Sequence, residues 1–459
     1  MSENALRVAV VGAGPSGFYA TDQLLKAGFE VDLLEVLPTP FGLVRAGVAP
    51  DHPKIKSVTR VYEKTAKHPG FRFFGGVELG GHVSRQDLLD RYHAVLYAVG
   101  TASDNKLGIP GEDRPGSHGA LEFVAWYNGH PDYADHEFDL SATRAVVIGN
   151  GNVAVDVARM LVLDPDEMAA TDTADHALGP LAAAQVHEVI VLGRRGPAQA
   201  AFTTPELREL GELTRADIIV DPADLELDPY SAQWLEEQGE PTNQRNVELM
   251  REYAAREPHG HERRVELRFL RSPLEILGEG EDGPVTGVRV GINRIEDGRA
   301  VPTGEEEVIS CGLVIRSIGY RGAPLAGIPF DERKGLISNL GGRVLNPETG
   351  EHERGEYVVG WVKRGPSGVI GTNKKDATDT VARILEDRDA GKLNTPRDPD
   401  PENVPAFLAE VCPSVVTWEG WRAIDVHETG LGEPQGRPRV KLVRTGEMID
   451  VASGALTQP

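Results

Sequence analysis

Short apolar runs, glycine turns and amphipathic stretches alternate from the start of the chain. The runs Arg7–Val11 and Val31–Leu34 are typical of buried strands, and Gly17–Ala27 has the spacing of a helix with one apolar side, ended by Gly28. A glycine-rich turn separates the first strand from this helix. The order strand, glycine turn, helix, strand predicts a dinucleotide-binding unit.

The same order returns further along the chain. Arg144–Ile148 and His187–Leu192 are predicted strands, and Val153–Leu163 is the predicted helix between them. Two more apolar runs, Arg91–Gly100 and Gly312–Tyr320, close on small-residue turns and share one layout. This alternation favours open parallel sheets, that is, an α/β fold with two Rossmann-like dinucleotide-binding domains.

The first glycine turn is a dinucleotide fingerprint followed by an acid. It reads Gly12-Ala-Gly14-Pro-Ser16-Gly17, and Glu35 lies 18 residues after Gly17. The glycines allow the backbone to approach a pyrophosphate, which the helix N-terminus stabilises. Because an acid at this spacing suits a free ribose 2′-hydroxyl, we expect FAD here.

The second glycine turn is followed by bases instead. It contains Asn150, Gly151, Asn152 and Val153, and its third glycine is replaced by Ala154, a variant that the fingerprint accepts. Arg194 and Arg195 follow the next predicted strand, and a guanidinium pair suits a 2′-phosphate. The gap between Ala154 and Arg194 is longer than the usual spacing, so the alternative interpretation is that the two arginines are solvated surface charges. The expectation is NADP(H) at this turn.

These patterns predict a discontinuous domain organisation. Residues 1–103 begin the FAD-binding domain, 104–322 form an inserted NADP-binding domain, and 323–459 complete the first domain.

Other segments give weaker signals. Prolines and glycines over 37–48 predict a loop without regular helix, crossing the flavin edge. Residues 164–186 are a polar insertion, 275–305 predict a small antiparallel excursion, and Asn373–Leu385 predicts a helix. The tail from about Asp398 is broken by prolines and predicts no clear element.

Composition limits the function classes. The chain has 459 residues and a net charge of −23, which argues against a nucleic-acid binder. Its N-terminus lacks the layout of a signal peptide and no apolar run approaches the ~18 residues of a membrane span, so a cytoplasmic protein is expected. Cys311 and Cys412 form no Cys-x-x-Cys pair and cannot hold an iron–sulfur cluster, so a cluster would belong to a partner. No metal site is expected.

Several polar and aromatic residues are candidates for the redox site. The glycines of 365–371 can aim backbone N–H groups at a reduced flavin, and Trp361 can cover a ring or pack in a core. His52 has a backbone fixed by neighbouring prolines, Asp156 follows the second fingerprint, and Glu206 and Glu209 lie in one predicted helical turn. Taken alone, each of these polar residues is also explained by a structural role. Hydride transfer needs orientation more than acid–base groups, so no triad is expected.

Longer blocks carry a resemblance to a known family. These are LPTPFGLVRAGVAPDHPKIK (37–56), FRFFG (71–75), IPGED (109–113), VVIGNGNVAVDVAR (146–159), GRRGPAQAAFT (193–203), RSIGYRG (316–322) and VVGWVKRGPSGVIGTNKKDA (358–377). Over nearly its whole length the chain resembles the adrenodoxin-reductase type of ferredoxin–NADP⁺ reductase, especially its bacterial members. The blocks at 37–56 and 358–377 are far more specific than either fingerprint.

The resemblance implies site residues one by one. It implies FAD contacts at Gly14, Ser16, Glu35, Leu43, Val48, Val83, Trp361, Gly368, Val369 and Ile370. It implies NADP contacts at Asn150, Gly151, Asn152, Val153, Arg194, Arg195, Glu206 and Gly368. It places His52, Asp156 and Glu209 around the flavin–nicotinamide contact. The chain departs from some relatives at Asn105, where they carry an arginine for NADP, and neighbouring Lys106 is a candidate replacement.

The resemblance also implies an iron–sulfur partner, because family members dock acidic ferredoxins on basic patches. The segment 245–271 holds seven arginines interleaved with glutamates, which is consistent with such a patch or with a solvated face. The expected function is an FAD-dependent NADPH:ferredoxin oxidoreductase. The alternatives are the flavin subunit of a glutamate-synthase-like reductase, which usually carries a cysteine-rich region, a flavin monooxygenase, and a non-catalytic NADP-sensing module.

Overall fold

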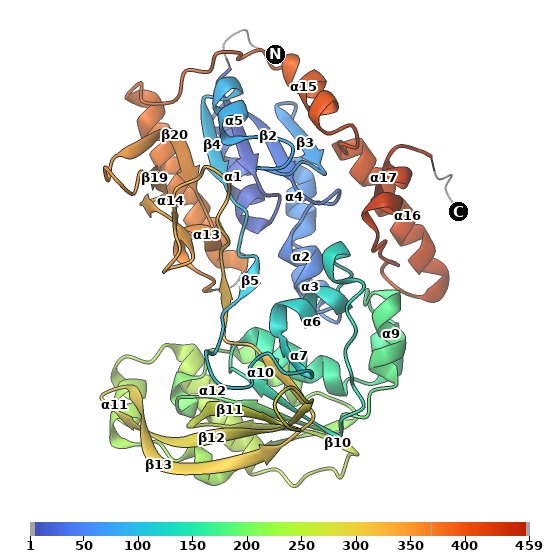
Figure 1. Ribbon diagram of the computed structural model, residues 1–459, viewed down its shortest axis with the longest axis vertical. Helices are drawn as coiled ribbons and strands as arrows, with labels where there is room; N and C mark the ends of the chain where they lie inside the picture. Colours follow the sequence, from blue (N-terminus) through green and yellow to red (C-terminus); the bar gives the residue numbers. More distant parts are fainter. Residues whose placement is uncertain (1–4, 369, 456–459) are drawn as a thin grey trace. The chain divides into compact units, whose positions relative to one another are not determined.

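The computed structural model describes residues 5–368 and 370–455 of the chain. Two compact units divide it: the first takes Met1–Ser103 and Tyr320–Pro459, and the second takes Asp104–Gly319. In Figure 1 the first unit therefore combines blue ribbon with orange and red, whereas the second runs from teal to yellow. The chain thus leaves the first unit once and returns to complete it.

One large sheet forms the centre of the first unit. Its strands are β1 (Arg7–Val11), β2 (Glu30–Glu35), β3 (Phe71–Gly75), β4 (Ala94–Tyr97), β18 (Asn339–Leu340), β19 (Arg343–Leu345) and β20 (His352–Val358), in the spatial order β18-β19-β20-β4-β1-β2-β3. The five strands from β20 to β3 are parallel, and β18 and β19 add an antiparallel edge. Parallel order places the carboxyl ends of β1 and β2 at one edge, where nucleotides bind in such sheets.

Helices cover both faces of this sheet. The first unit contains α1 (Pro15–Lys26), α2 (Leu43–Ala46), α3 (Pro53–Lys56), α4 (Thr59–Thr65), α5 (Arg85–Arg91), α13 (Trp361–Arg364), α14 (Ile370–Asp389), α15 (Asn403–Val411), α16 (Trp418–Gly432) and α17 (Thr445–Ala452). α1 packs against α14, so segments from opposite ends of the chain meet in one layer. Val8 and Val10 of β1 join one buried cluster, and Ala9 and Val11 join another. Burial on both faces explains the unbroken apolar run in β1.

The second unit has a fully parallel six-stranded sheet. Its strands are β6 (Ser117–Gly119), β7 (Arg144–Ile148), β8 (Glu188–Leu192), β9 (Ala216–Val220), β10 (Arg263–Arg268) and β14 (Leu313–Arg316), in the order β6-β14-β7-β8-β10-β9. Every pairing in it is parallel. The helices of this unit are α6 (Ala120–Tyr127), α7 (Asn152–Val162), α8 (Pro165–Ala169), α9 (Asp175–Ala182), α10 (Thr204–Leu210), α11 (Pro229–Glu237) and α12 (Pro241–Ala254). Two Rossmann-like sheets confirm the expected fold class.

A separate antiparallel sheet covers one face of this parallel sheet. It consists of β11 (Arg271–Gly278), β12 (Val285–Glu296) and β13 (Arg299–Ser310). Ile276 and Val288 of this sheet pack with Val146 and Ile190 of the parallel strands. The antiparallel excursion expected over 275–305 is therefore confirmed, and it extends beyond that range at both ends.

Three segments depart from the expectations. The loop over 37–48 contains the helical turn α2, which begins after Phe41 and Gly42, both at positive φ (85° and 47°). The insertion over 164–186 forms α8 and α9, and the tail beyond Asp398 forms α15, α16 and α17. Proline occupies the first positions of α8, where its missing N–H leaves no bond unmade. In the described part of the chain, no helix is both long and apolar enough to cross a membrane.

Candidate nucleotide and redox sites

The first fingerprint turn is packed at two of its glycines. A Cβ at Gly12, whose φ is 107°, would lie 2.5 Å from the Ala98 carbonyl oxygen, and a Cβ at Gly17 would collide with the Gly12 carbonyl. The Gly12 N–H donates to the Leu34 carbonyl at 2.8 Å. These two glycines are therefore required by the fold itself, for the close approach of the fingerprint turn to α1 and to the turn after β4.

The middle glycine of this turn faces open space instead. A Cβ at Gly14 would meet no atom within 4 Å, and Gly14 is the N-cap of α1 with no side chain capping the helix. An uncapped helix N-terminus beside an open glycine is an anion site, because free N–H groups and the helix dipole point into it. This cradle fits a pyrophosphate.

Glu35 closes one side of this cradle. It ends β2, is buried, and accepts hydrogen bonds from the Ala13 N–H (2.7 Å) and the Leu37 N–H (3.3 Å). Burial raises the pKa of its carboxyl, and these backbone donors act in the opposite direction. The acid therefore lies directly beside the fingerprint turn, where a ribose hydroxyl would reach it.

The segment from Phe41 to Val48 lies against the same turn. The Phe41 N–H donates to the Ala13 carbonyl at 2.9 Å, and a Cβ at Gly42 would lie 3.0 Å from the Cα of Gly14. Leu43 and Val48 are half-buried and are joined by a bond from the Val48 N–H to the Leu43 carbonyl (2.7 Å). The structure thus brings the two predicted FAD contacts of this segment to the first fingerprint.

His52 follows this segment and is the N-cap of α3. Its side chain is 3% exposed, and its Nε2 lies 4.0 Å from the Asp51 carboxylate. The His52 carbonyl accepts from the Lys56 N–H at 3.2 Å, so the first turn of α3 fixes its backbone. The neighbouring prolines predict a fixed backbone at His52, and its position as helix N-cap before Pro53 agrees with that prediction.

The glycine-rich segment before α14 meets the first fingerprint through Ser16. Ser16 is buried, and a Cβ at Gly360, whose φ is 81°, would collide with its side chain. The Gly360 N–H donates to Asp376 at 2.6 Å, which anchors the segment to α14. Gly368 also has a positive φ (79°), and Ile370 begins α14. Val369 lies outside the described residues.

Trp361 carries an unmatched donor in this region. Its indole Nε1 is buried and has no hydrogen-bond partner among the described residues, and its ring lies 5.9 Å from that of Tyr320. Buried indole N–H groups are normally paired, so a bound acceptor is the expected partner. Val83 is buried in the turn after Glu78, where its N–H donates to the Glu78 carbonyl at 3.1 Å, and it belongs to the same apolar cluster as Val362.

The second fingerprint repeats the geometry of the first. A Cβ at Gly149, whose φ is 130°, would collide with the Ser317 carbonyl, and the Gly149 N–H donates to the Leu192 carbonyl at 2.9 Å. Gly151 faces open space within 4 Å and is the N-cap of α7, again without a side-chain cap. This turn therefore also forms an open anion cradle.

Arg194 and Arg195 follow β8 at the carboxyl edge of the sheet. Both are exposed, and neither makes an ion pair with the residues that the structure describes. The only side-chain bond found for either guanidinium runs from Arg195 to the Gln199 carbonyl at 3.4 Å, again within the described chain. Two guanidinium groups free of carboxylates are available to a phosphate.

The segment after these arginines is held by the fingerprint asparagines. The Asn152 side chain accepts from the Thr203 N–H at 2.8 Å, and the Asn150 carbonyl accepts from the Ala201 N–H at 3.0 Å. Val153, the next residue of α7, is half-buried. The structure therefore brings the predicted NADP contacts of the fingerprint together with the segment that begins at Arg194.

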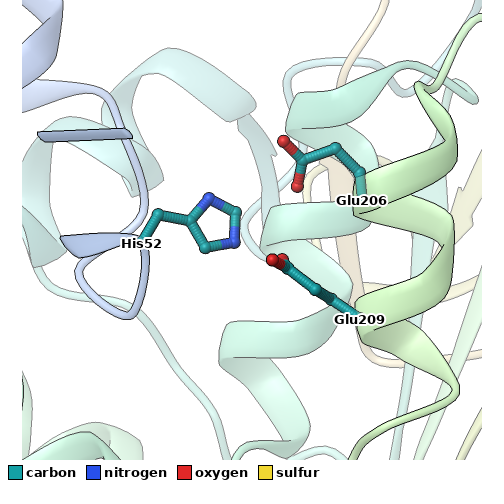
Figure 2. Close-up of side chains that lie close together, drawn as sticks. All are labelled: His52, Glu206 and Glu209. Carbon is teal, nitrogen blue, oxygen red and sulfur yellow. The ribbon is translucent and has the colours of Figure 1, made fainter. Parts of the chain in front are cut away.

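An arginine absent from the expectations connects Asp156 with Glu209. Arg159, whose side chain is 4% exposed, donates to Asp156 at 3.2 Å and to Glu209 at 2.9 Å, and so ties α7 to α10. Glu206 is buried one turn earlier on α10, and carboxylate oxygens of the two glutamates lie within 4.8 Å of each other. Figure 2 shows both glutamates extending from the same side of α10, and it also draws His52 of the first unit. The spacing Asp156–Arg159, three residues apart on a helix, was the available sequence signal.

Lys106 and several arginines of 245–271, which the sequence offers as ligand or partner contacts, have carboxylate partners in the structure. Lys106 is exposed and its amine lies 3.1 Å from the Asp113 carboxylate, while the Asn105 N–H donates to the Gly319 carbonyl. Four of the seven arginines of 245–271 are paired with carboxylates of the second unit. Their carboxylate partners are Glu188 for Arg264, Glu266 for Arg268, Glu307 for Arg271, and Glu248 and Glu252 for Arg245.

The cysteines do not form a dithiol. Cys311 belongs to the second unit and Cys412 to the first, and both are buried and free. Burial raises the pKa of the Cys311 thiol to about 12, so this thiol stays protonated near neutral pH.

Comparisons with known proteins agree with this geometry. The family model described as pyridine nucleotide-disulphide oxidoreductase matches residues 6–192. NADPH-ferredoxin reductase FprA of Mycobacterium tuberculosis is 50% identical over 97% of this chain and 99% of its own length. The mitochondrial NADPH:adrenodoxin oxidoreductase of Salvelinus fontinalis is 41% identical, over 97% and 91%. A probable ferredoxin/ferredoxin–NADP reductase of Mycobacterium bovis is 44% identical, over 99% and 77%.

A solved structure gives the same result. Mycobacterium tuberculosis FprA in complex with NADPH matches this structure with a TM-score of 0.91 and 48% identity, covering 98% of this chain and 100% of that one.

Proposed function

Because the chain belongs to the family of the NADPH-ferredoxin reductases and NADPH:adrenodoxin oxidoreductases, we propose that it transfers electrons from NADPH, through FAD, to a ferredoxin-type iron–sulfur protein in the cytoplasm. The single observation that carries this proposal is the pair of open glycine cradles, one beside a buried acid and one beside two arginines free of ion pairs with described residues.

The first unit is the proposed FAD-binding domain. Gly12 and Gly17 shape the cradle, Gly14 leaves room for the pyrophosphate, and Glu35 would bind the ribose hydroxyls. Leu43 in α2 and Val48 just after it would contact the flavin, and the unmatched Nε1–H of Trp361 would supply a donor. The N-terminus of α14 would stabilise negative charge on the reduced flavin.

The second unit is the proposed NADP-binding domain. Gly151 leaves room for the pyrophosphate, while Arg194 and Arg195 would bind the 2′-phosphate through charge-assisted hydrogen bonds. Glu206 is the proposed contact of the nicotinamide half. Preference for NADPH over NADH then depends on the two arginines.

The electron balance requires a carrier that changes the number of electrons per step. Bound FAD supplies this chemistry, because it accepts a hydride and returns its electrons singly. Overall, one NADPH and two oxidised ferredoxins give NADP⁺, one H⁺ and two reduced ferredoxins.

The polar residues of this chain have positioning and proton-holding roles in the proposal. Asp156 and Glu209 share the buried Arg159, which fixes the orientation of both carboxylates. His52 is held rigidly as the N-cap of α3 and would present its imidazole at the flavin–nicotinamide contact. None of these groups is required to form a covalent bond, because orientation of the two ring systems is the main demand of hydride transfer.

Purification and anaerobic titration test the function. We expect a yellow protein with one FAD per chain whose visible absorbance bleaches with one equivalent of NADPH and returns on addition of two equivalents of oxidised [2Fe–2S] ferredoxin. A colourless protein that cannot be reconstituted with FAD would refute the proposal. Bleaching without return of the absorbance would also refute it, because the partner assignment would then be wrong.

A further inference from the structure

The helices α3 and α4 carry a basic surface on a strongly acidic chain. Five cations lie between residues 54 and 67, namely Lys54, Lys56, Arg60, Lys64 and Lys67, whereas the whole chain has a net charge of −23. Glu63 is the only acid in this stretch. We refer to these five residues as the α3–α4 basic surface.

The helical geometry places three of these cations along one side. Arg60, Lys64 and Lys67 are spaced at i, i+4 and i+7 from α4 into the turn after it, and all three are exposed. Tyr62 and Thr65 are buried on the opposite side, where they anchor α4 to the first unit. The anchored side is fixed by the core, so the charged side keeps a constant orientation.

Four of the five charges on this surface have no carboxylate partner among the described residues. Lys54, Arg60, Lys64 and Lys67 make no ion pair with any residue that the structure describes, and the Glu63 carboxylate lies 3.6 Å from Arg422 on α16. Among the seven arginines of 245–271, by contrast, four are paired with carboxylates, namely Arg245, Arg264, Arg268 and Arg271. Positive charge is therefore less offset on α3–α4, where residues 54–67 hold five cations and one acid, than on 245–271, where five glutamates accompany seven arginines.

Two apolar side chains lie among these cations. Ile55 is 38% exposed and Val61 is 50% exposed, and both belong to the small set of large apolar residues that the described chain leaves to solvent. Apolar contacts surrounded by charges are the ordinary make-up of a transient protein interface. The same surface would therefore contribute both attraction and desolvation energy.

Its location suits electron transfer. α3 begins at Pro53, directly after His52, and the preceding segment from Phe41 to Val48 contacts the first fingerprint. A partner bound to α3 and α4 is thus held against the unit that we assign to FAD. This step depends on the proposed function.

We propose that the α3–α4 basic surface is the docking site of the iron–sulfur partner, an acidic ferredoxin-type protein. The overall charge of −23 repels an acidic protein from most of the surface, so a local basic region must both attract the partner and select its orientation. Acidic side chains of the partner bind Lys54, Arg60, Lys64 and Lys67, and an apolar contact of the partner covers Ile55 and Val61.

Charge reversal with a matched control tests this surface. The test variant is Arg60→Glu with Lys64→Glu, and the control is Arg251→Glu with Arg256→Glu on and after α12, which changes the net charge equally in the second unit. The KM for a purified acidic [2Fe–2S] ferredoxin is measured with saturating NADPH. Reduction of menadione, a small neutral acceptor, reports the NADPH and FAD half of the reaction.

The expected result is specific to the test variant. Its KM for ferredoxin rises about tenfold or more at low salt, and the difference from the native chain shrinks as ionic strength increases. Menadione reduction and FAD content stay unchanged, and the control variant keeps a KM within about twofold of the native value. The milder pair Arg60→Gln with Lys64→Gln gives an intermediate KM, which separates docking from any folding defect.

The two possible failures are distinguishable. If the native chain oxidises NADPH with ferredoxin but the KM of the test variant does not change, this docking site is wrong and the proposed function stands. If the control alone raises the KM, docking occurs on the segment 245–271 instead. If the native chain reduces neither menadione nor ferredoxin, the proposed function itself fails.

Discussion

A buried carboxylate on α16 is expected to hold in place the segment from Phe41 to Val48, which we propose contacts the flavin. Glu428 is completely buried, and it accepts from Arg45 Nη1 (2.8 Å), Arg439 Nη1 (3.0 Å) and the Leu442 N–H (2.8 Å). Arg45 lies in α2, between Leu43 and Val48, and its guanidinium is 5.6 Å from the Trp421 ring centroid. The perturbation is Glu428→Gln, which keeps the shape and removes the charge.

The magnitude follows from the loss of one partner in a buried ion network. Removing one member of such a pair costs about 3–5 kcal/mol, because the remaining charge stays buried without compensation. Arg439 keeps Asp425 at 2.9 Å, so only Arg45 is left without a carboxylate among the described residues. Because one charge and not two loses its partner, we expect a loss of stability at the lower end of this range, about 3 kcal/mol. With a urea dependence of about 3 kcal/mol per molar, the unfolding midpoint of the first unit falls by about 1 M.

The assay combines urea unfolding with release of FAD, followed by the rise in flavin fluorescence. Exposed Glu433 gives the matched control Glu433→Gln, expected within about 0.5 kcal/mol of the native chain. In Glu428→Gln, FAD release should precede the loss of secondary structure, because α2 loosens first. If release and unfolding coincide with the native curves, the network does not hold α2 and the reasoning is wrong.

The pH dependence adds a second check on the same residue. Burial alone would raise the pKa of Glu428, but Arg45 and Arg439 hold it below its ordinary range. A depressed folded-state pKa contributes stability above the unfolded value, about 4.3, and that stability is lost as pH falls through the folded value. The gap between the native chain and Glu428→Gln should therefore be full at pH 7 and should shrink below about pH 4.

Three further predictions concern the cradles and the second unit. Replacing Arg194 and Arg195 with alanine should raise the KM for NADPH about 10- to 100-fold, from lost charged hydrogen bonds, and leave that for NADH unchanged; equal effects on both would contradict the assignment. Gly14→Val should lower the FAD to protein ratio without unfolding, because no protein atom lies within 4 Å of its Cβ, whereas Gly179→Ala on α9 should retain FAD. Burial, together with Glu122, raises the pKa of Asp104 to about 7, against the Leu121 N–H. Its contribution to stability is thus present below the unfolded pKa of about 4 and lost as pH rises through about 7. Asp104→Asn should therefore make the melting temperature depend less on pH between pH 5 and 8, because it removes about 1–2 kcal/mol of pH-dependent stability.

The sequence predicts the two fingerprints well because their causes are local. Glycine spacing, the following helix and the apolar strand all lie within about 30 residues, and the structure places β1, α1 and β2 within a few residues of the expected ranges. The acid after β2 and the bases after β8 are found for the same reason. The nucleotide that each cradle prefers is predicted from the charge of these residues alone.

Features that depend on residues distant in the sequence could not be predicted from local patterns. The turn α2 forms because Phe41 and Gly42 adopt positive φ against the fingerprint, and no local propensity requires this. The tail folds because Trp421 and Met448 enter the core of the first unit, which prolines along the tail conceal. Arg264 and Arg271 look like free cations until Glu188 and Glu307 are seen beside them.

The two fingerprint turns pack in the same way, so a difference in nucleotide specificity must arise outside them. Gly12 packs against the turn after β4, and Gly149 packs against the turn after β14; Ala98 and Ser317 in those turns donate to Val11 and Ile148, each at 2.7 Å.

Because the backbone cradles have the same geometry, we expect them to bind a pyrophosphate alike and not to distinguish two dinucleotides by themselves. Discrimination must come from the residue that follows the second strand of each unit. There Glu35 is buried and bonded to the Ala13 N–H, whereas Arg194 and Arg195 are exposed and make no ion pair with described residues. A buried acid would face an added phosphate with an uncompensated like charge, so we predict that the first cradle rejects a 2′-phosphorylated ligand and that the second selects one.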